Sequence, residues 1–221
     1  MGIDRLKEII EGSKNIVFFG GAGTSTESNI PDFRSADTGM YKKEKRYPYP
    51  PEIMISHTFF ISHPEEFFSF YRKEMVFKEA RPNDAHIVLA ELERMGKVKA
   101  VITQNIDGLH QMAGSKNVLE LHGSIHRNYC MDCGREYDLD SILESETPVP
   151  KCENCGGIVR PDVVLYEEGL DMQVLNKSIR AIKRADVLIV GGTSLVVYPA
   201  AGLVEYFKGD ELVLINKSPT R

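Results

Sequence analysis

Residues Asn15 to Thr26, NIVFFGGAGTST, decide the fold of this chain. The apolar run Asn15–Phe19 predicts a short buried strand, and Gly20, Gly21 and Gly23 predict a tight turn directly after it. Glycines at this point let the backbone approach a pyrophosphate, and a helix beginning after the turn would add amide donors. Taken alone, the pattern fits a nucleotide site and a plain tight turn about equally well.

The turn departs from the dinucleotide fingerprint of hydride-transfer enzymes. A G-x-G-x-x-G motif starting at Gly21 has Gly23 in place but Thr26 as its last residue. The fingerprint also needs a second strand ending in an acidic residue about 20 residues later. Here that region is the aperiodic, polar stretch Pro31–Pro51, which predicts a long loop. The sequence therefore predicts a Rossmann-type nucleotide site without the dehydrogenase layout.

The rest of the chain alternates strand and helix patterns. Apolar, β-branched runs predict further strands at Val98–Thr103, Val118–Leu121, Asp186–Val190 and Leu212–Ile215. Helical periodicity and end signals predict helices at Ile3–Ile10, Pro64–Lys78, Asn83–Met95, Asp171–Arg184 and Pro199–Phe207. This alternation predicts an α/β fold, a Rossmann-like parallel-sheet domain spanning residues 1–221.

Two cysteine pairs interrupt this alternation. Cys130 and Cys133 form one C-x-x-C knuckle, and Cys152 and Cys155 form a second one after eighteen intervening residues. Two knuckles at this spacing are typical of a tetrahedral, four-cysteine zinc site, with no position left open for catalysis. A disulfide or a redox C-x-x-C is the alternative. We therefore predict a small inserted zinc-ribbon module over residues 124–160, stabilised by one structural Zn²⁺.

Polar residues follow the predicted strands at their carboxyl ends, where α/β sheets bind ligands. They are Gln104, Asn105, Asp107, His122, Thr193, Ser194 and Asn216. Any one of them could be a turn or cap residue, and Asp107 could cap a helix over residues 108–112. Together they predict a pocket, in which His122 is the candidate general base. His57, His63, His86, His110 and His126 lack that setting.

Composition excludes several classes of protein. The chain has 221 residues, 27 basic and 32 acidic, for a net charge of −5. It therefore offers no basic excess for nucleic acid or an anionic membrane, although it could bind a basic peptide. The sequence predicts no secretory signal and no transmembrane span. We expect a soluble, cytoplasmic protein that binds neither nucleic acid nor membrane directly.

The motifs, in this order, resemble those of the sirtuins, the NAD-dependent protein deacylases, and above all the small bacterial and archaeal members. Besides the two cysteine knuckles, the matching stretches are Gly21-Ala-Gly-Thr-Ser25, Ile30-Pro-Asp-Phe-Arg34, Thr103-Gln-Asn-Ile-Asp-Gly-Leu-His110, Leu121-His-Gly123, Arg160-Pro-Asp-Val-Val164, Gly192-Thr-Ser-Leu195 and Ile215-Asn216. They cover nearly the whole chain.

The resemblance implies an NAD site and assigns roles to its residues. Asp107 would accept hydrogen bonds from the nicotinamide carboxamide, and Asn105 would hold the ribose or a bound water. Phe33 would shield the reactive sugar, and Arg34 would help seat the cofactor. The implied NAD-binding residues are Gly21, Ala22, Gly23, Ser25, Thr26, Ile30, Asp32, Phe33, Arg34, Gln104, Asn105, Ile106, Asp107, His122, Thr193, Ser194 and Asn216.

The resemblance also implies the reaction. Acetyl-lysine proteins or peptides would be the substrates, binding as a strand beside Val163–Tyr166 and the Leu195–Tyr198 segment. The substrate-binding residues would be Val163, Val164, Tyr166 and Val196. The acyl oxygen would attack the ribose carbon as nicotinamide leaves. His122 would act as general base on the ribose hydroxyls, with free lysine and O-acetyl-ADP-ribose as products.

Two departures from the family pattern stand out. Asn29 replaces a glycine, and asparagine tolerates a left-handed backbone well. Glu167 replaces the glycine of a Phe-Gly-Glu motif on the peptide-facing wall.

Residues near Tyr71 bear on the acyl group. Relatives that remove succinyl groups carry Tyr-x-x-Arg, whereas this chain has Tyr71 and Glu74, and Arg72 lies about 100° around the helix. We therefore expect short neutral acyl groups to be preferred.

Two other functions fit the same pocket. One is a mono-ADP-ribosyltransferase, which would share the first step, and the other is an NAD-binding sensor without turnover. The presence of Asn105, Asp107 and His122 argues against the sensor.

Overall fold

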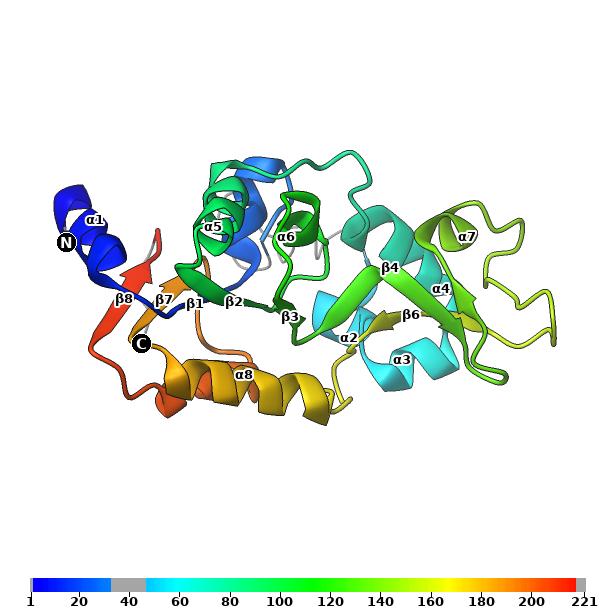
Figure 1. Cartoon of the computed structure of the whole chain (residues 1–221). Helices are drawn as coiled ribbons and strands as arrows, with labels where there is room; N and C mark the ends of the chain where they lie inside the picture. Colours follow the sequence, from blue (N-terminus) through cyan, green and yellow to red (C-terminus); the bar gives the residue numbers. More distant parts are fainter. Residues whose placement is uncertain (1, 33–46, 218–221) are drawn as a thin grey trace.

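The computed structural model describes residues 2–32 and 47–217, so Phe33 and Arg34 lie outside the described residues. Within them, five strands form a parallel sheet in the order β3-β2-β1-β7-β8 (Figure 1). The strands are β1 (Ile16–Gly20), β2 (Val98–Thr103), β3 (Val118–Glu120), β7 (Val187–Gly191) and β8 (Glu211–Ile215). The predicted Rossmann-like parallel sheet is confirmed.

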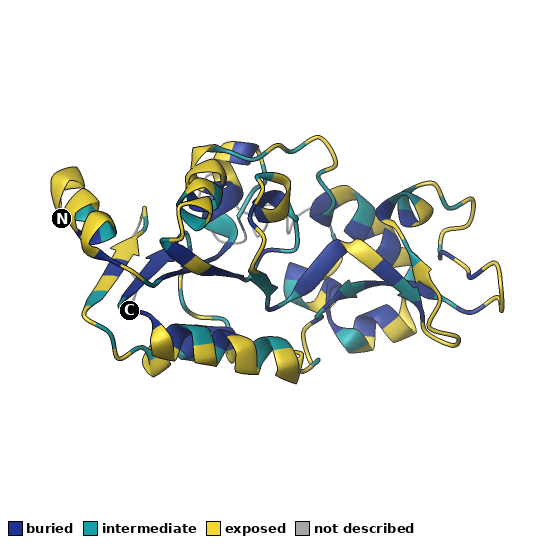
Figure 2. Ribbon diagram, viewed as in Figure 1, coloured by how far each residue is buried: buried dark blue, intermediate teal, exposed yellow. Residues whose placement is uncertain are grey.

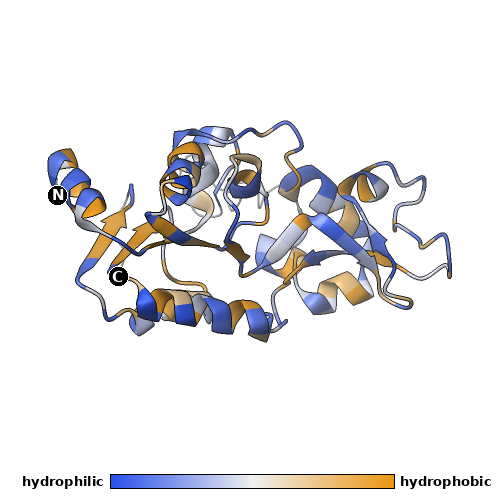
Figure 3. Cartoon of the chain, viewed as in Figure 1, coloured by the Kyte–Doolittle hydropathy of each residue, from blue (hydrophilic) through white to orange (hydrophobic). Residues whose placement is uncertain are grey.

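Helices cover both faces of this sheet because its strands are apolar on both sides. Val17 and Phe19 of β1 pack with Ile182 of α8 (Met172–Arg184) on one face. Ile16 and Phe18 pack on the other face, together with apolar residues of α1 (Ile3–Gly12) and α5 (Asp84–Arg94). The alternation along β1 thus follows the two-residue period of a strand. In Figure 3, α8 shows alternating polar and apolar residues, as expected for a helix with one buried side.

The strand order reverses between β1 and β7, since β2 and β3 lie on one side and β8 on the other. Ligands in open α/β sheets bind beyond the carboxyl ends of the strands at such a point. The glycine turn follows β1 here and leads into a 3₁₀ helix at Ala22–Ser28. Asn29 ends that helix with φ 63°, the left-handed conformation that asparagine was expected to tolerate.

A second, antiparallel sheet holds the cysteine segment in the order β5-β4-β6. Its strands are β4 (Gly123–Cys130), β5 (Glu136–Tyr137) and β6 (Val159–Val163), and α7 (Leu139–Leu143) lies between β5 and β6. Four short helical segments from an earlier part of the chain lie beside it (Figure 1). They are α2 (Pro51–Met54), α3 (His57–Ser62), α4 (Pro64–Phe70) and a π-helical turn at Tyr71–Met75.

These two parts share one hydrophobic core. Phe60, Phe67 and Tyr71 are essentially fully buried and belong to the same cluster as Ile142 and Val159. Figure 2 shows buried residues both on the short helices and on the strands of this part. The cysteine segment was predicted as a polar module without an apolar run of its own. The structure shows that it obtains apolar partners from helices more than fifty residues upstream. We call the two parts together, residues 50–76 and 123–165, the small module.

Several predicted helices have different boundaries or hydrogen bonding. The helix predicted at Pro64–Lys78 is α at Pro64–Phe70 and then π-helical to Met75. The helix predicted at Pro199–Phe207 is a 3₁₀ helix over Ala200–Tyr206. The helices α2, α3 and α7 were not predicted, because four to six residues are too few to show a helical period. No helix among the described residues is long and apolar enough to cross a bilayer.

Candidate active site and metal centre

The glycine turn joins the ends of β1 and β7. The amide of Gly23 donates to the carbonyl of Gly192 (2.8 Å), and that of Gly21 donates to the carbonyl of Gly191 (3.2 Å). Gly192 has φ 59°, and a Cβ added there would lie 2.3 Å from the amide nitrogen of Thr24. Only glycine allows this approach of the two backbones. The close packing fixes the turn at the point where the strand order reverses.

A cavity of about 880 Å³ opens at this edge of the sheet. This volume lies within the usual range of small-molecule sites. Of the residues predicted from the sequence, it is lined by Gly21, Ala22, Gly23, Ser25, Thr26, Ile30, Asp32, Gln104, Asn105, Ile106, Asp107, His122, Val163, Val164, Tyr166, Thr193, Ser194 and Asn216. The structure therefore gathers these residues from distant parts of the chain into one site. Val196 does not line the cavity; its neighbours Val197 and Tyr198 do.

Sequence reasoning missed part of the lining. Ile55, Glu74 and Met75 line the cavity from the small module, so the cavity lies between that module and the sheet. Asn83 also lines it, and its side-chain amide donates to the carbonyl of Thr24 (2.8 Å) and to Oγ of Ser28 (3.0 Å). The only sequence signal for Asn83 was its position as the N-cap of a helix.

Three polar side chains form a hydrogen-bonded group inside the cavity. The hydroxyl of Ser25 donates to Oδ2 of Asp107 (2.7 Å) and accepts from Nδ2 of Asn105 (3.0 Å). Ser25 is 1% exposed and Asn105 9% exposed, so these bonds form away from bulk water. Oδ1 of Asp107 accepts from the amide of Leu109 (2.9 Å) at the start of α6 (Leu109–Met112). Asp107 therefore serves the helix start as well as the cavity.

Two buried histidines lie behind this group. The rings of His86 and His110 have centroids 4.6 Å apart, and Nε2 of His86 lies 3.5 Å from Oγ of Ser25. Burial lowers the pKa of His86, and it lowers the pKa of His110 to about 3. Both rings are therefore neutral at physiological pH. Their place behind Ser25 could not be predicted from the sequence, since it depends on tertiary packing.

The ring of His122 is oriented by a backbone carbonyl. Its Nδ1 lies 2.9 Å from the carbonyl oxygen of Gln104, which can only accept a hydrogen bond. The Nδ1 atom therefore carries the proton, and Nε2 keeps a free lone pair. Burial lowers the pKa of His122, and the hydrogen bond to Gln104 opposes this shift only in part. The imidazole is thus neutral at pH 7, as a general base must be.

Thr193 joins three strand ends on the other side of the cavity. Its hydroxyl accepts from Nε2 of Gln104 (3.0 Å), which follows β2, and its carbonyl accepts from Nδ2 of Asn216 (2.6 Å), which follows β8. The residue itself follows β7 and is 8% exposed. Three strand ends predicted to be polar are therefore connected through one residue.

The four cysteines form a cluster outside this cavity. Their sulfur atoms all lie within 4.8 Å of one another. Cys130 Sγ is 3.4 Å from Cys155 Sγ, and Cys133 Sγ is 3.6 Å from Cys152 Sγ. A disulfide would need about 2.0 Å. Four Zn–S bonds of about 2.3 Å at tetrahedral angles place sulfurs about 3.8 Å apart, so the cluster fits a structural zinc.

One neighbour favours the thiolate form that zinc requires. The hydroxyl of Tyr137 donates to Sγ of Cys152 (3.1 Å) and lowers the pKa of this thiol. Cys130 and Cys152 belong to the hydrophobic core of the small module. A metal here would therefore connect the two knuckles to that core.

The family model described as "Sir2 family" matches residues 21–199. The chain belongs to the Sir2 family. The resemblance to sirtuins drawn from the motifs is thereby confirmed. The chain is 66% identical to an NAD-dependent protein deacetylase of Clostridium acetobutylicum, over 99% of this chain and 89% of that protein. It is 64% identical to one of Clostridium tetani, over 97% of this chain and 87% of that protein.

Solved Sir2 structures share the whole fold. A Sir2 complex with a p53 peptide and NAD⁺ is 41% identical, with a TM-score of 0.86 over 100% of this chain and 88% of that chain. Sir2Tm bound to a propionylated peptide is 39% identical, also with a TM-score of 0.86, over 100% of this chain and 88% of that chain. Phe33 and Arg34, predicted to contact the cofactor, lie outside the described residues.

Proposed function

We propose that this Sir2-family chain is an NAD-dependent protein lysine deacetylase. It would transfer the acetyl group of an acetyl-lysine to the ADP-ribose part of NAD, releasing nicotinamide, free lysine and O-acetyl-ADP-ribose. The observation that carries this proposal is the cavity at the strand-order reversal, in which Asn105, Asp107 and His122 meet. Identity of 66% to a deacetylase over nearly the full length supports the same activity.

The residues present fit NAD. The glycine turn at residues 21–25 lines the cavity and would face the pyrophosphate, and Thr193, Ser194 and Asn216 would hold the adenosine half. At the other end of the cavity, the half-buried carboxylate of Asp107 can accept from a carboxamide, and Asn105 can hold a ribose hydroxyl or a water. NAD supplies a ribose carbon whose bond to nicotinamide breaks readily when a nucleophile is aligned with it.

His122 would accept a proton from a ribose hydroxyl. The bond from Nδ1 to the carbonyl of Gln104 holds the ring and leaves Nε2 as the basic atom. The lowered pKa keeps this atom unprotonated at neutral pH. Proton removal would make the ribose oxygen a better nucleophile and so promote transfer of the acetyl group from lysine to the ribose.

The acyl-lysine peptide would bind as a strand between two segments at the cavity. Val163, Val164 and Tyr166 line the cavity on one side, and Val196, half-exposed beside it, would contact the peptide on the other. Backbone pairing would supply most of the affinity. A structural zinc in the four-cysteine cluster would hold the small module that carries the first of these segments.

The acyl site would favour short neutral groups. Glu74 lines the cavity, is 6% exposed, and accepts from the hydroxyl of Tyr47 (2.8 Å). Arg72 does not face the cavity, because its guanidinium donates to the carbonyls of Ile142 and Pro148. An acyl carboxylate would thus meet a carboxylate and find no cation from this helix.

One assay tests the proposal. The purified protein is incubated with NAD, with and without an acetyl-lysine peptide, and nicotinamide, free lysine and ADP-ribose products are measured. Peptide-dependent nicotinamide release with equimolar free lysine is the expected result. ADP-ribose attached to protein would show a transferase instead, and no release under any condition would show an NAD-binding sensor.

A further inference from the structure

Glu167 occupies a backbone position that favours glycine. Its φ is 75°, in the left-handed region where a side chain crowds the backbone. It lies in the turn that ends the peptide-facing segment Val163–Tyr166. A residue held in this region persists only where its surroundings over-determine it. Contacts of Glu167 with its surroundings must therefore stabilise this conformation.

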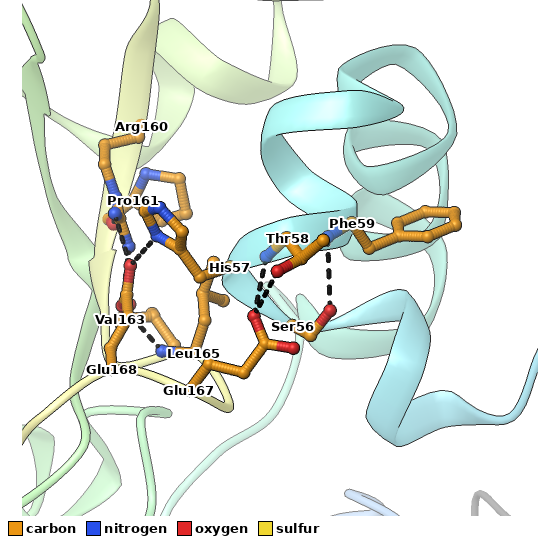
Figure 4. A network of polar contacts seen from close by, with 10 residues as sticks. All are labelled: Ser56, His57, Thr58, Phe59, Arg160, Pro161, Val163, Leu165, Glu167 and Glu168. Carbon is orange, nitrogen blue, oxygen red and sulfur yellow. Dashed lines mark hydrogen bonds and ion pairs between the residues drawn. The ribbon is translucent and has the colours of Figure 1, made fainter.

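The carboxylate of Glu167 supplies these contacts. Oε2 of Glu167 accepts from both the amide (2.8 Å) and the hydroxyl (2.7 Å) of Thr58, in the first turn of α3 (Figure 4). Thr58 and Glu167 are 109 residues apart in the chain. The carboxylate therefore ties the turn to a helix of the small module, and the two bonds lower the pKa of Glu167.

The flanking residues bind His57 at the start of the same helix and also Ile55 and Arg160, which lie outside it. The amide of Tyr166 donates to the carbonyl of Ile55 (3.1 Å), and the amide of His57 donates to the carbonyl of Tyr166 (3.0 Å). Glu168 accepts from Nδ1 of His57 (2.8 Å) and from Nη1 of Arg160 (2.7 Å). Backbone bonds therefore fix Tyr166, whereas the left-handed residue that follows it is fixed through its own side chain.

We propose that Glu167 is a positioning residue for the peptide-facing segment: its carboxylate, bound to Thr58, holds the turn in the left-handed conformation and so sets the edge to which the acetylated peptide pairs. Glu167 does this without taking part in the chemistry. The inference rests on the proposed deacetylase function, because it assigns the edge to peptide binding. Where a glycine would adopt the left-handed conformation without strain, Glu167 is held in it by the hydrogen bonds of its carboxylate to Thr58, which we call the anchor.

Four variants separate the anchor from the backbone strain. Glu167→Ala keeps the strain and removes the anchor, whereas Glu167→Gly removes both. Glu167→Gln keeps an oxygen that can accept both bonds, and Thr58→Val removes one donor while keeping the amide. Glu66→Ala, an exposed glutamate on α4, is the control in the same module.

Steady-state kinetics with an acetyl-lysine peptide give the first readout. We expect Glu167→Ala to raise the KM for peptide about three- to tenfold, since a charge-assisted pair of hydrogen bonds is lost at an exposed site. The KM for NAD and kcat should stay within about twofold of the wild-type values. Glu167→Gly and Thr58→Val should show smaller increases, and Glu167→Gln and Glu66→Ala should behave like the wild type.

Hydrogen exchange gives a second readout that needs no turnover. In the free protein, the amide of Thr58 should exchange faster in Glu167→Ala than in the wild type or in Glu66→Ala. An unchanged peptide KM in Glu167→Ala would overturn the proposal, as would parallel losses in kcat and both KM values. If the wild type does not deacetylate the peptide, the proposed function fails, whereas unchanged exchange at Thr58 refutes the anchor itself.

Discussion

The hydroxyl of Ser25 donates a 2.7 Å hydrogen bond to Oδ2 of Asp107 and thereby joins the glycine turn after β1 to the loop after β2. Ser25 is buried and also accepts from Asn105, so its hydroxyl hydrogen is committed to Asp107. The geometry makes the carboxylate part of a rigid group and not a mobile surface acid. Its replacement should therefore affect what the cavity binds.

We expect Asp107→Asn to weaken inhibition by nicotinamide and to slow nicotinamide exchange, each by about tenfold or more. The reason is that the amide offers one acceptor oxygen where the carboxylate offers two. The measurement is inhibition by nicotinamide, together with exchange of labelled nicotinamide into NAD. Asp162→Asn, on a partly exposed carboxylate bound to Arg127, is the matched control. Unchanged inhibition and exchange in Asp107→Asn would contradict the assignment.

His122→Ala should lower deacetylation by about 10²–10⁴-fold, since a general base is lost. Binding of NAD should largely survive, because His122 is assigned to ribose hydroxyls and not to the pyrophosphate. Calorimetric titration with NAD and single-turnover assays with peptide measure the two effects. His63→Ala, on an exposed ring that stacks on Phe59, should leave both unchanged. Near wild-type turnover in His122→Ala would remove the residue from this role.

The pH dependence of deacetylation should reflect the ionisation of His122. Burial lowers the pKa of His122 below 6.5, and the neutral ring is the active form. Activity should therefore be level from pH 7 to 8 and fall only as the pH drops below about 6.5, through the lowered pKa. A profile of kcat/KM against pH for the acetyl-peptide measures this. A decline that is already half complete above pH 7 would be inconsistent with a half-buried His122 whose ring is neutral at pH 7.

Zinc should be present at one ion per chain in folded protein. Replacing Cys130 or Cys152 by alanine should unfold the small module, because both sulfurs belong to the cluster and to the module's core. Elemental analysis gives the stoichiometry, and thermal unfolding with activity assays gives the consequence. Met131→Ala, on an exposed side chain within the same knuckle, is the control. Fully active, folded protein without metal would refute the zinc site.

Acetyl-lysine should be processed with a higher kcat/KM than succinyl-lysine in the same peptide. The buried carboxylate of Glu74 lines the cavity and would repel an acyl carboxylate. Glu74→Gln removes that charge and should narrow the gap between the two substrates. Equal kcat/KM values in the wild type, or a preference for succinyl, would show that the acyl group binds elsewhere.

The parts of the fold that were predicted have local signals. The strand and glycine turn at residues 15–23 and the spacing of Cys130, Cys133, Cys152 and Cys155 are patterns within short windows, and the structure bears out both the sheet and the sulfur cluster. Polar residues after the strands could also be placed together, because parallel strands share one carboxyl edge.

The parts that were missed depend on contacts between distant segments. Nothing near Thr58 indicates that Glu167 will bind it, and the N-cap pattern of Asn83 does not reveal its bonds to the glycine turn. The π-helical turn at Tyr71–Met75 differs from an α-helix in its hydrogen bonds, which periodicity does not encode. Glu74 could be recognised from the motif, but its place in the cavity required the tertiary structure.

The shared core of the small module has a consequence for protein engineering. Phe60 and Phe67 come from one stretch of chain, and Ile142 and Val159 come from another. Because all four belong to one core, the cysteine segment is not an independently folding unit. Cutting out or transplanting residues 124–160 would leave the aromatic faces of α3 and α4 in water, where they would promote aggregation. A chimera between relatives should therefore exchange residues 50–76 and 123–165 together, so that the apolar surfaces that pack against each other come from the same protein.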